Sequence, residues 1–412
     1  MRCCIRRAVA VILLLFARSA EGYLGLSGTP GPLDFFLREA FRGDEVEDRD
    51  FRYRDDYFLN VFSTRHLTSS DALWGAAARG YRLAMGSVTS DEFFLDQEAR
   101  FEVALLPGLA LHYRFVQAED YDSRYLRHAV GLSYRTTQAL TAYGFTRLNG
   151  FKEDIDAGGG LRVTAGPLDL DLGFVFPQAF LNLKSRTEAR FEKQAFGLGG
   201  VATLALAPRW HLTLRLFRTF PLELEKPREA LLFSFRRLAY GASVAYHFHP
   251  TRSLRLALYG EDAVKVRQFS GSRAAESARL ERTALRLTLV YTQAWPGGTL
   301  LDTGLFVHYF YEPTRFPQAP AQSLTRRRTE VIGFGQLAMP VWKGFTLVPG
   351  VFLGPVEAVD RRTDALGFGL EAKVSLALAY RFSPRAYLQL QPSYDLDDRI
   401  FGGAGPTLVV VF

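Results

Sequence analysis

Strict alternation of polar and apolar side chains near the end of the chain constrains the fold more than any other feature. Between Ala386 and Tyr394, one side of an extended strand carries Leu388, Leu390, Pro392 and Tyr394, and the other carries Tyr387, Gln389, Gln391 and Ser393. A strand of this kind has one face for apolar surroundings and one for water, as the strands of membrane barrels do. The final run, Pro406 to Phe412, is apolar and rich in β-branched residues. In a soluble domain it would leave an exposed edge, whereas a closed barrel pairs its last strand with its first.

Phe412 ends this amphipathic last strand, and a terminal phenylalanine there resembles the assembly signal of bacterial outer-membrane proteins. The resemblance implies recognition by the outer-membrane assembly machinery. No stretch after the N-terminus approaches the roughly 20 apolar residues of a membrane helix. We therefore predict an all-β fold, a closed antiparallel transmembrane β-barrel that crosses the bacterial outer membrane many times and contacts its lipid and lipopolysaccharide.

The N-terminus has the layout of a secretory signal peptide. Arginines precede an apolar run from Ala8 to Ala17, which small residues follow. Cleavage after Ser19 and cleavage after Gly22 both fit, and we assign residues 1–22 to the signal. Residues 23–78 are predicted to form a periplasmic or lumenal segment, either a plug or docking arm or a leader to the barrel at 79–412. Both cysteines, Cys3 and Cys4, leave with the signal, so we expect no disulfide and no cysteine metal ligand.

Short turn signals recur along the chain and predict the number of strands. Turn residues join paired strands at Leu106-Pro107-Gly108, Thr137-Gln138, Ala165-Gly166-Pro167, Ala207-Pro208, His249-Pro250-Thr251, Pro296-Gly297-Gly298, Trp342-Lys343-Gly344 and Ser383-Pro384-Arg385. Eight turns give sixteen strands, and the C-terminal strand and one near Tyr81 to Val88 raise the count to about eighteen, with sixteen as the alternative. Strands such as Leu109–Val116 and Leu168–Phe176 have about the 9–11 residues that a tilted crossing needs. Longer polar connections alternate with the turns.

The alternation also assigns the two faces. Leu285, Leu287, Leu289 and Tyr291 face lipid in one such strand, with aromatic residues at the turn end of the outer face. The predicted pore-lining residues are Arg100, His112, Arg114, Arg135, Arg215, His247, Arg255, Arg282, Arg286, Asp302, Lys373 and Arg381. Carboxylates on the same face include Glu98, Glu102, Asp169, Asp171 and Glu371. The lumen is thus predicted to be wet, of mixed charge and richer in cations.

The sequence predicts no enzymatic activity, no cofactor and no metal site. Ser243 and His247 share the inner face, but four residues of strand at about 3.3 Å each keep them apart. The formal charge of +7 falls to about +4 without residues 1–22, which indicates no nucleic-acid partner. The cluster Arg326, Arg327 and Arg328 is interpreted as a loop that faces lipopolysaccharide phosphates.

Frequent arginine and leucine, the eighteen-strand count and the short loops resemble the outer-membrane barrels of myxobacterial-type polysaccharide secretion. That resemblance implies secretion of a polysaccharide with the help of a periplasmic polysaccharide-export protein, and a polymer path lined by the inner arginines and tyrosines. Two alternatives stay open. One is a non-conducting barrel that anchors a surface or motility complex. The other is a porin for general or hydrophobic solutes.

Overall fold

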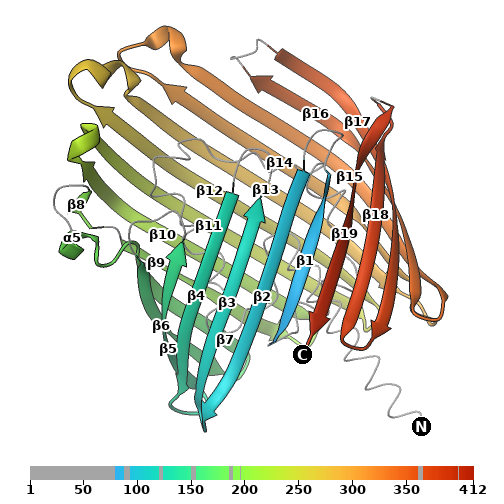
Figure 1. Cartoon of the computed structure of the whole chain (residues 1–412). Coiled ribbons are helices and arrows are strands. Elements are labelled where there is room, and N and C mark those ends of the chain that lie inside the picture. Colours follow the sequence, from blue (N-terminus) through green and yellow to red (C-terminus); the bar gives the residue numbers. More distant parts are fainter. Residues whose placement is uncertain are drawn as a thin grey trace.

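The chain forms a closed antiparallel β-barrel (Figure 1). The computed structural model describes residues 79–87, 93–119, 124–149, 155–184, 189–194, 196–360, 365–397 and 399–412. The predicted signal peptide and the segment 23–78 lie outside these residues. Strand β1 (Gly80–Ser87) pairs with β2 (Phe93–Leu106) on one side and with β19 (Ile400–Val411) on the other. The last strand therefore returns to the first, as the sequence predicted.

The described residues hold nineteen strands that occupy eighteen positions around the barrel. Strands β8 (Arg190–Lys193) and β9 (Phe196–Ala207) follow each other in sequence, and both pair with β10 (Trp210–Lys226). They form one interrupted strand, because β8 pairs with the end of β10 around Leu224 and β9 pairs with the rest. The predicted count of eighteen is confirmed.

Each remaining strand pairs with its neighbours in sequence. Their bounds are β3 (Leu109–Glu119), β4 (Arg124–Arg135), β5 (Leu140–Asn149), β6 (Asp156–Ala165), β7 (Leu168–Phe176), β11 (Leu231–His249), β12 (Arg252–Phe269), β13 (Ala278–Ala294), β14 (Leu300–Arg315), β15 (Leu324–Trp342), β16 (Phe345–Asp360), β17 (Ala365–Ser383) and β18 (Ala386–Asp395). The described residues include four short helices, all in connections: α5 (Leu181–Lys184), η3 (Pro227–Glu229), η4 (Gly271–Glu276) and η5 (Pro320–Gln322). Among the described residues, no helix is long and apolar enough to cross a membrane.

All eight predicted turns connect consecutive strands at one end of the barrel. Glycine supplies the backbone geometry in several of them. Gly108 and Gly344 have φ angles of 81° and 77°, in the left-handed region that other residues avoid. The opposite end carries the longer connections, including η4 and η5. In bacterial outer-membrane barrels, the short turns lie at the periplasmic end.

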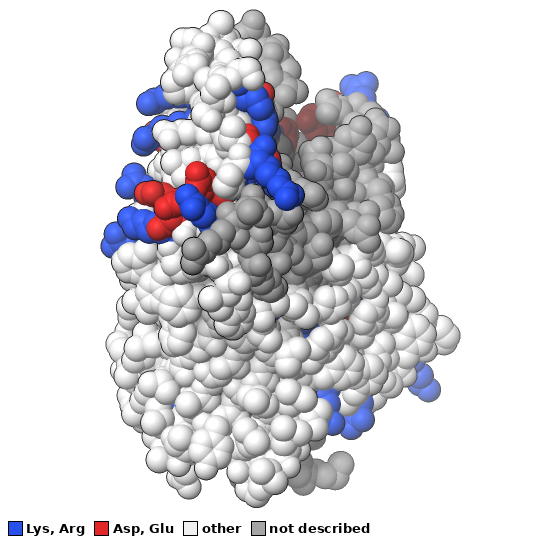
Figure 2. Space-filling view, turned by 60° about the vertical axis from the view of Figure 1, so that its left-hand side comes forward, with Lys and Arg blue, Asp and Glu red and all other residues white. Residues whose placement is uncertain are grey.

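The strands β10 to β17 are much longer than the predicted 9–11 residues. Each contains 16–19 residues. In Figure 1 they form a tall wall that extends past the shorter strands β2 to β7 at the end with the longer connections. In Figure 2, charged residues gather on the upper part of the face shown, above a broad uncharged region. The extra length therefore extends beyond the apolar band that lipid would cover.

The two faces of this wall exchange character along its length. In the lower half of β11, Tyr240, Val244 and Tyr246 face outward, while Ser243 and His247 face inward. Beyond Arg237 the inner positions become apolar. The side chains of Phe233, Phe235, Leu222 and Leu224 are buried there in one apolar cluster. The outer positions become polar at the same level, with Arg236 on β11 and Glu223 and Glu225 on β10.

Aromatic residues surround the outer face at the short-turn end, as predicted. Close ring pairs there are Trp210–Tyr246 (4.5 Å), Tyr246–Phe248 (4.7 Å), Phe345–Tyr380 (4.3 Å), Tyr380–Phe382 (4.6 Å) and Phe101–Phe412 (6.2 Å between centroids). Tyrosine, tryptophan and phenylalanine are enriched where a membrane barrel passes the lipid–water boundary. Phe412 faces outward in this girdle, and 60% of it is exposed.

We predict that Phe412 contributes to assembly more than to the stability of the assembled barrel. Because its ring is exposed, little buried area is lost when it is removed. Deletion of Phe412 should lower the amount of inserted protein, while the inserted fraction keeps its heat-modifiable mobility on semi-native gels. Phe382→Ala is the matched control, since Phe382 is an equally exposed girdle residue on β17, and its protein level should stay near wild type. Equal levels for the deletion and wild type would contradict the assembly role.

Candidate functional site: the inner wall

Ten of the twelve predicted pore-lining residues lie on the inner face of the barrel wall. Burial alternates along each strand, and the buried or half-buried positions include Arg100, His112, Arg114, Arg215, His247, Arg255, Arg282, Arg286, Asp302 and Lys373. The other two, Arg135 and Arg381, are exposed at the short-turn rim. Arg381 donates to the backbone oxygens of Ser383 and Pro384, so it stabilises a turn. Both share the inner-face parity of their strands, so their place in the pore lining stays a prediction.

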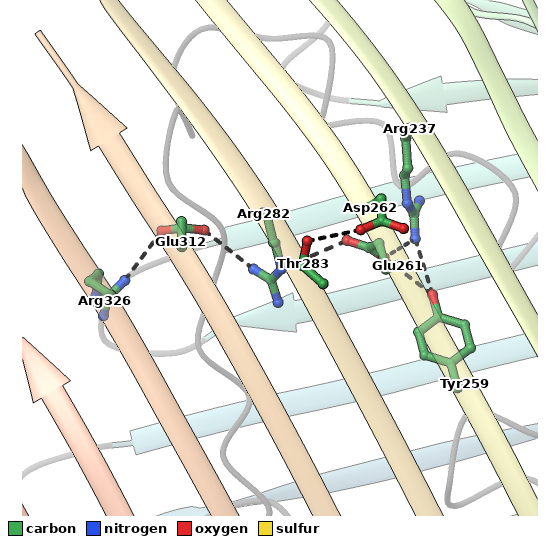
Figure 3. A network of polar contacts seen from close by, with 8 residues as sticks. All are labelled: Arg237, Tyr259, Glu261, Asp262, Arg282, Thr283, Glu312 and Arg326. Atoms are coloured by element: carbon green, nitrogen blue, oxygen red, sulfur yellow. Dashed lines mark hydrogen bonds and ion pairs between the residues drawn. The ribbon is translucent and has the colours of Figure 1, made fainter.

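Charged side chains cross the tall wall as one continuous row, which we name the ion-pair ladder (Figure 3). It runs from β11 to β15 through Arg237, Glu261, Arg282, Glu312 and Arg326. Arg237 Nη2 donates to Glu261 Oε2 at 2.6 Å. Arg282 lies between two carboxylates, with Nε 3.8 Å from Glu261 Oε1 and Nη1 3.7 Å from Glu312 Oε2. Arg326 Nη1 lies 3.8 Å from the other oxygen of Glu312. Acid and base thus alternate across five strands.

Burial makes the ladder energetically important. The side chain of Glu312 is fully buried, and those of Arg237, Glu261 and Arg282 are at most 10% exposed. Buried carboxylates and guanidinium groups are costly unless they are paired and hydrogen-bonded. Tyr259 contributes a further hydrogen bond, donating its hydroxyl to Glu261 Oε2 at 3.2 Å. On the outer face next to the ladder, Thr283 donates to the exposed Asp262 at 2.9 Å, where the apolar outer band ends.

The charged network continues toward β17 and β18. Arg328 Nε donates to Glu330 Oε1 at 2.7 Å, and His308 Nδ1 lies 3.7 Å from Glu330 Oε2. Arg328 also reaches past β16 to Glu371, at 3.7 Å. Lys373 Nζ lies 3.0 Å from Asp395 Oδ1. These pairs continue the row of charged side chains along the inner face, from β14 and β15 to β17 and β18.

A second group of charged residues lines the inner face of the shorter strands β2 to β7. Glu98 accepts from Arg100 Nε at 3.1 Å and also from Arg114. Arg147 Nη2 lies 3.2 Å from Asp156 Oδ2, and both side chains are almost fully buried. Arg162 pairs with Asp169, and the Tyr143 hydroxyl donates to Asp171 at 2.5 Å. Three of the carboxylates predicted on the inner face, Glu98, Asp169 and Asp171, therefore act as partners of inner-face arginine or tyrosine side chains.

Uncharged hydrogen-bonding groups run along β18. The Tyr387 hydroxyl donates to Gln389 Oε1, and Gln389 Nε2 donates to Gln391 Oε1, both at 3.0 Å. Two residues further, the Ser393 hydroxyl donates to the Gly402 carbonyl at 2.8 Å. This run, which we name the amide row, is the polar face that the sequence alternation predicted.

Several inner-face residues were not in the predicted set. These are Arg82, Arg147, Asp156, Arg237, Glu261, Lys265, Arg267, Glu312, Arg326, Arg328, Glu330 and Asp395. Alternation carried to the ends of β11, β12 and β14 would have found Arg237, Glu261, Lys265, Arg267 and Glu312, because these share the parity of the predicted residues on their strands. Inner arginine and lysine residues outnumber inner carboxylates, in agreement with the predicted cation excess.

The interpretation of Arg326, Arg327 and Arg328 as a loop was wrong. All three lie within β15, with Arg326 and Arg328 inward and Arg327 outward, paired with Glu357. On the connection formed by η4, Arg273 does occupy a loop. Its hydrogen bond to Glu276 lowers the pKa of that carboxyl, so the pair is already satisfied within the loop. Within the described ranges, no three histidine, cysteine or acidic side chains are grouped so as to hold a metal ion.

An antiparallel wall that closes on itself, is apolar outside over the length of a lipid crossing, and is charged inside is the architecture of transmembrane β-barrels. The chain is an outer-membrane-type β-barrel. No protein-family model and no curated protein match the sequence.

Solved structures with a similar fold include a bacterial polysaccharide outer membrane secretin, at 9% identity and TM-score 0.43, which covers 82% of this chain and 99% of that one. Others are a loop-deletion mutant of OmpT, an outer membrane protein of Vibrio cholerae, at 12% identity and TM-score 0.41 over 80% and 97% of the two chains. CdiB from Acinetobacter baumannii matches at 10% identity and TM-score 0.43, over 81% of this chain and 60% of its own.

We predict that Arg282 stabilises the barrel through the ladder. Arg282→Gln leaves Glu261 and Glu312 facing a neutral side chain in a buried site, which should cost about 3 kcal/mol of unfolding free energy. The measurement is the urea midpoint of the barrel in detergent. Arg279→Gln is the matched control on the outer face of β13, where the exposed pair with Glu281 should contribute less than about 1 kcal/mol. Equal midpoints for the two variants would show that the ladder does not stabilise the fold.

Proposed function

We propose that this barrel is a channel for hydrophilic cargo in the bacterial outer membrane. The single observation that supports it best is the inner wall, which carries charged side chains from β2 round to β18, while the outer wall is apolar at the level of the band. A charge on the lipid face near the midplane costs roughly 2–4 kcal/mol, so such residues are tolerated where water can reach them. A barrel of eighteen strands is also wide enough for an aqueous channel.

The cargo we favour is a polysaccharide, secreted with a periplasmic export protein. Sugars offer many hydroxyl groups and few apolar faces, and amide and hydroxyl side chains are suitable neutral partners for them. The amide row on β18 supplies such groups in sequence along the direction of the strand. The cation excess on the inner wall would further favour a polymer that carries carboxylate or phosphate groups.

A second candidate is a barrel that anchors a surface or motility complex without conducting. One observation favours it. Part of the upper inner wall, on β10, β11 and β13, is apolar, with Phe233, Leu222 and Leu280 fully buried. An apolar, buried region within the wall is expected where the barrel is filled, and not where it is only a water path. Absence of conductance in purified wild-type protein would favour this anchoring role.

The channel proposal predicts a change in ion selectivity when the charge of an inner arginine is reversed. Arg286 is half-buried on the inner face of β13, opposite His308 on β14. Arg286→Glu should shift the reversal potential in a planar bilayer toward cation selectivity, because a negative wall attracts cations. Arg279→Glu, on the outer face of the same strand, should leave it unchanged. If both variants form heat-modifiable barrels with the wild-type reversal potential, ions do not pass this wall.

The polysaccharide proposal predicts a separate effect in cells. The double variant Gln389→Ala/Gln391→Ala removes two amides from the amide row and leaves the charged pairs in place. The amount of surface polysaccharide should fall by at least half, while the ion conductance of the purified barrel should stay at the wild-type level. The control is the outward pair Leu388→Ala/Leu390→Ala on the same strand, which should leave export of inserted protein unchanged. Normal export by the Gln389→Ala/Gln391→Ala variant would count against a sugar path along β18.

A further inference from the structure

Three polar side chains from neighbouring strands meet on the inner face near the short-turn end. His112 Nε2 on β3 lies 2.7 Å from Ser133 Oγ on β4. The other ring nitrogen, His112 Nδ1, lies 3.6 Å from Glu102 Oε2 on β2. The serine is therefore hydrogen-bonded to a histidine whose far side faces a carboxylate. We name these residues the serine–histidine–glutamate row.

Strand pairing brings these residues together. Glu102 lies directly opposite His112, and His112 lies directly opposite Gly131 on β4. Because Gly131 has no side chain, the imidazole can lean toward Ser133, two residues further along β4. The pair that the sequence offered, Ser243 and His247, lies on one strand instead. Residues on one strand four positions apart do not meet, whereas residues on adjacent strands do.

The site combines a protected nucleophile with access to solvent. Ser133 is 7% exposed, the side chain of His112 is 12% exposed, and that of Glu102 is 48% exposed. The row lies close to the short turns, since Ser133 is two residues from the end of β4. Arg100 and Arg114 occupy the next inner positions on β2 and β3, where both donate to Glu98. A nucleophile hydrogen-bonded to a base, which a third group orients, is the signature of covalent hydrolysis.

We propose that this row is a hydrolytic site that cleaves carboxylic esters of hydrophilic molecules in the lumen. Ser133 and His112 are its catalytic residues, and Glu102 is a positioning residue that orients the imidazole. The row faces inward, so the phospholipids that surround the outer wall do not reach it. The natural substrate class, an O-acyl ester on a sugar, rests on the proposed polysaccharide function, whereas the site itself does not.

The reaction that this geometry supports has two steps. Ser133 Oγ attacks the ester carbonyl carbon while its proton passes to His112 Nε2. The tetrahedral intermediate then breaks its bond to the leaving alkoxide, which takes that proton and departs as the alcohol. In the second step, water attacks the acyl-serine and gives a proton to His112. The proton returns to Ser133 Oγ as the carboxylic acid leaves.

The test uses the full mature barrel in detergent, with a fluorescent fluorophosphonate and p-nitrophenyl acetate as probes. The serine oxygen displaces fluoride from the phosphonate, so labelling reports an activated serine directly. Wild type should be labelled, and Ser133→Ala should not be. Hydrolysis of p-nitrophenyl acetate should fall at least about 100-fold in Ser133→Ala and in His112→Ala, and a long-chain phospholipid should not be cleaved by wild type.

Ser243→Ala is the matched control, since it removes a buried inner-face hydroxyl from β11 and should keep wild-type labelling and rate. Glu102→Gln should reduce hydrolysis about tenfold, and Glu102→Asp should restore part of it, which a merely structural role for the carboxylate would not produce. Heat-modifiable mobility checks the fold of every variant. Wild type that is not labelled, or Ser133→Ala that is labelled like wild type, would overturn the proposal. Conductance measured on the Ser133→Ala barrel separates the two proposals, because it should equal that of wild type whichever cargo the channel carries.

Discussion

The pairing of β1 with β19 is the constraint on which the rest of the structure depends. Inside a lipid bilayer, a backbone N–H or C=O group without a partner costs several kcal/mol, so an open sheet edge cannot be left there. The register from Gly80 opposite Val411 to Ala84 opposite Thr407 removes that edge. Closure also defines an inside and an outside, and every choice of side chain along the strands follows from that distinction.

The tall wall shows how one strand satisfies two environments in turn. At the level of the apolar band, β11 presents aromatic and aliphatic residues outward and small or polar residues inward. Beyond Arg237 the surroundings of the outer face are water, and there the apolar residues lie inward. A strand that changes face in this way needs no break in its alternation, since polar and apolar types simply exchange positions. The same sheet is therefore a membrane wall below and the side of a water-exposed structure above.

Local patterns in the sequence predicted the features that local chemistry controls. The eight turns depend on glycine, proline and polar residues at fixed places, and alternation assigned the faces of β3, β11, β13 and β18 correctly. Strand length was underestimated because the prediction assumed that every strand ends with the membrane. The alternation in fact continues through charged outer residues such as Arg279 and Glu281.

Side-chain contacts between strands could not be predicted from the sequence. His112 and Ser133 are 21 residues apart, and Arg237 and Glu261 are 24 apart. Each pair meets only through a particular register. Packing over glycine is similar: Tyr143 lies over Gly160, where a Cβ would come within 2.5 Å of the tyrosine oxygen. A glycine in a strand does not reveal which ring covers it. Register is a property of the whole barrel, and it therefore limits what can be read from one strand.

The position of the ion-pair ladder has a consequence for selectivity. Ala263 and Arg282 pair across β12 and β13 directly beside Asp262 and Thr283, where the outer band gives way to polar residues. The ladder thus lies at the upper boundary of the band, and its acids and bases alternate, so its own field largely cancels. The cation excess comes from elsewhere, from Arg215, Arg255 and Arg286 lower on the tall wall. If the proposed channel carries an anionic cargo, that cargo is attracted below the ladder, toward the short-turn end, and meets a nearly neutral boundary at the ladder itself.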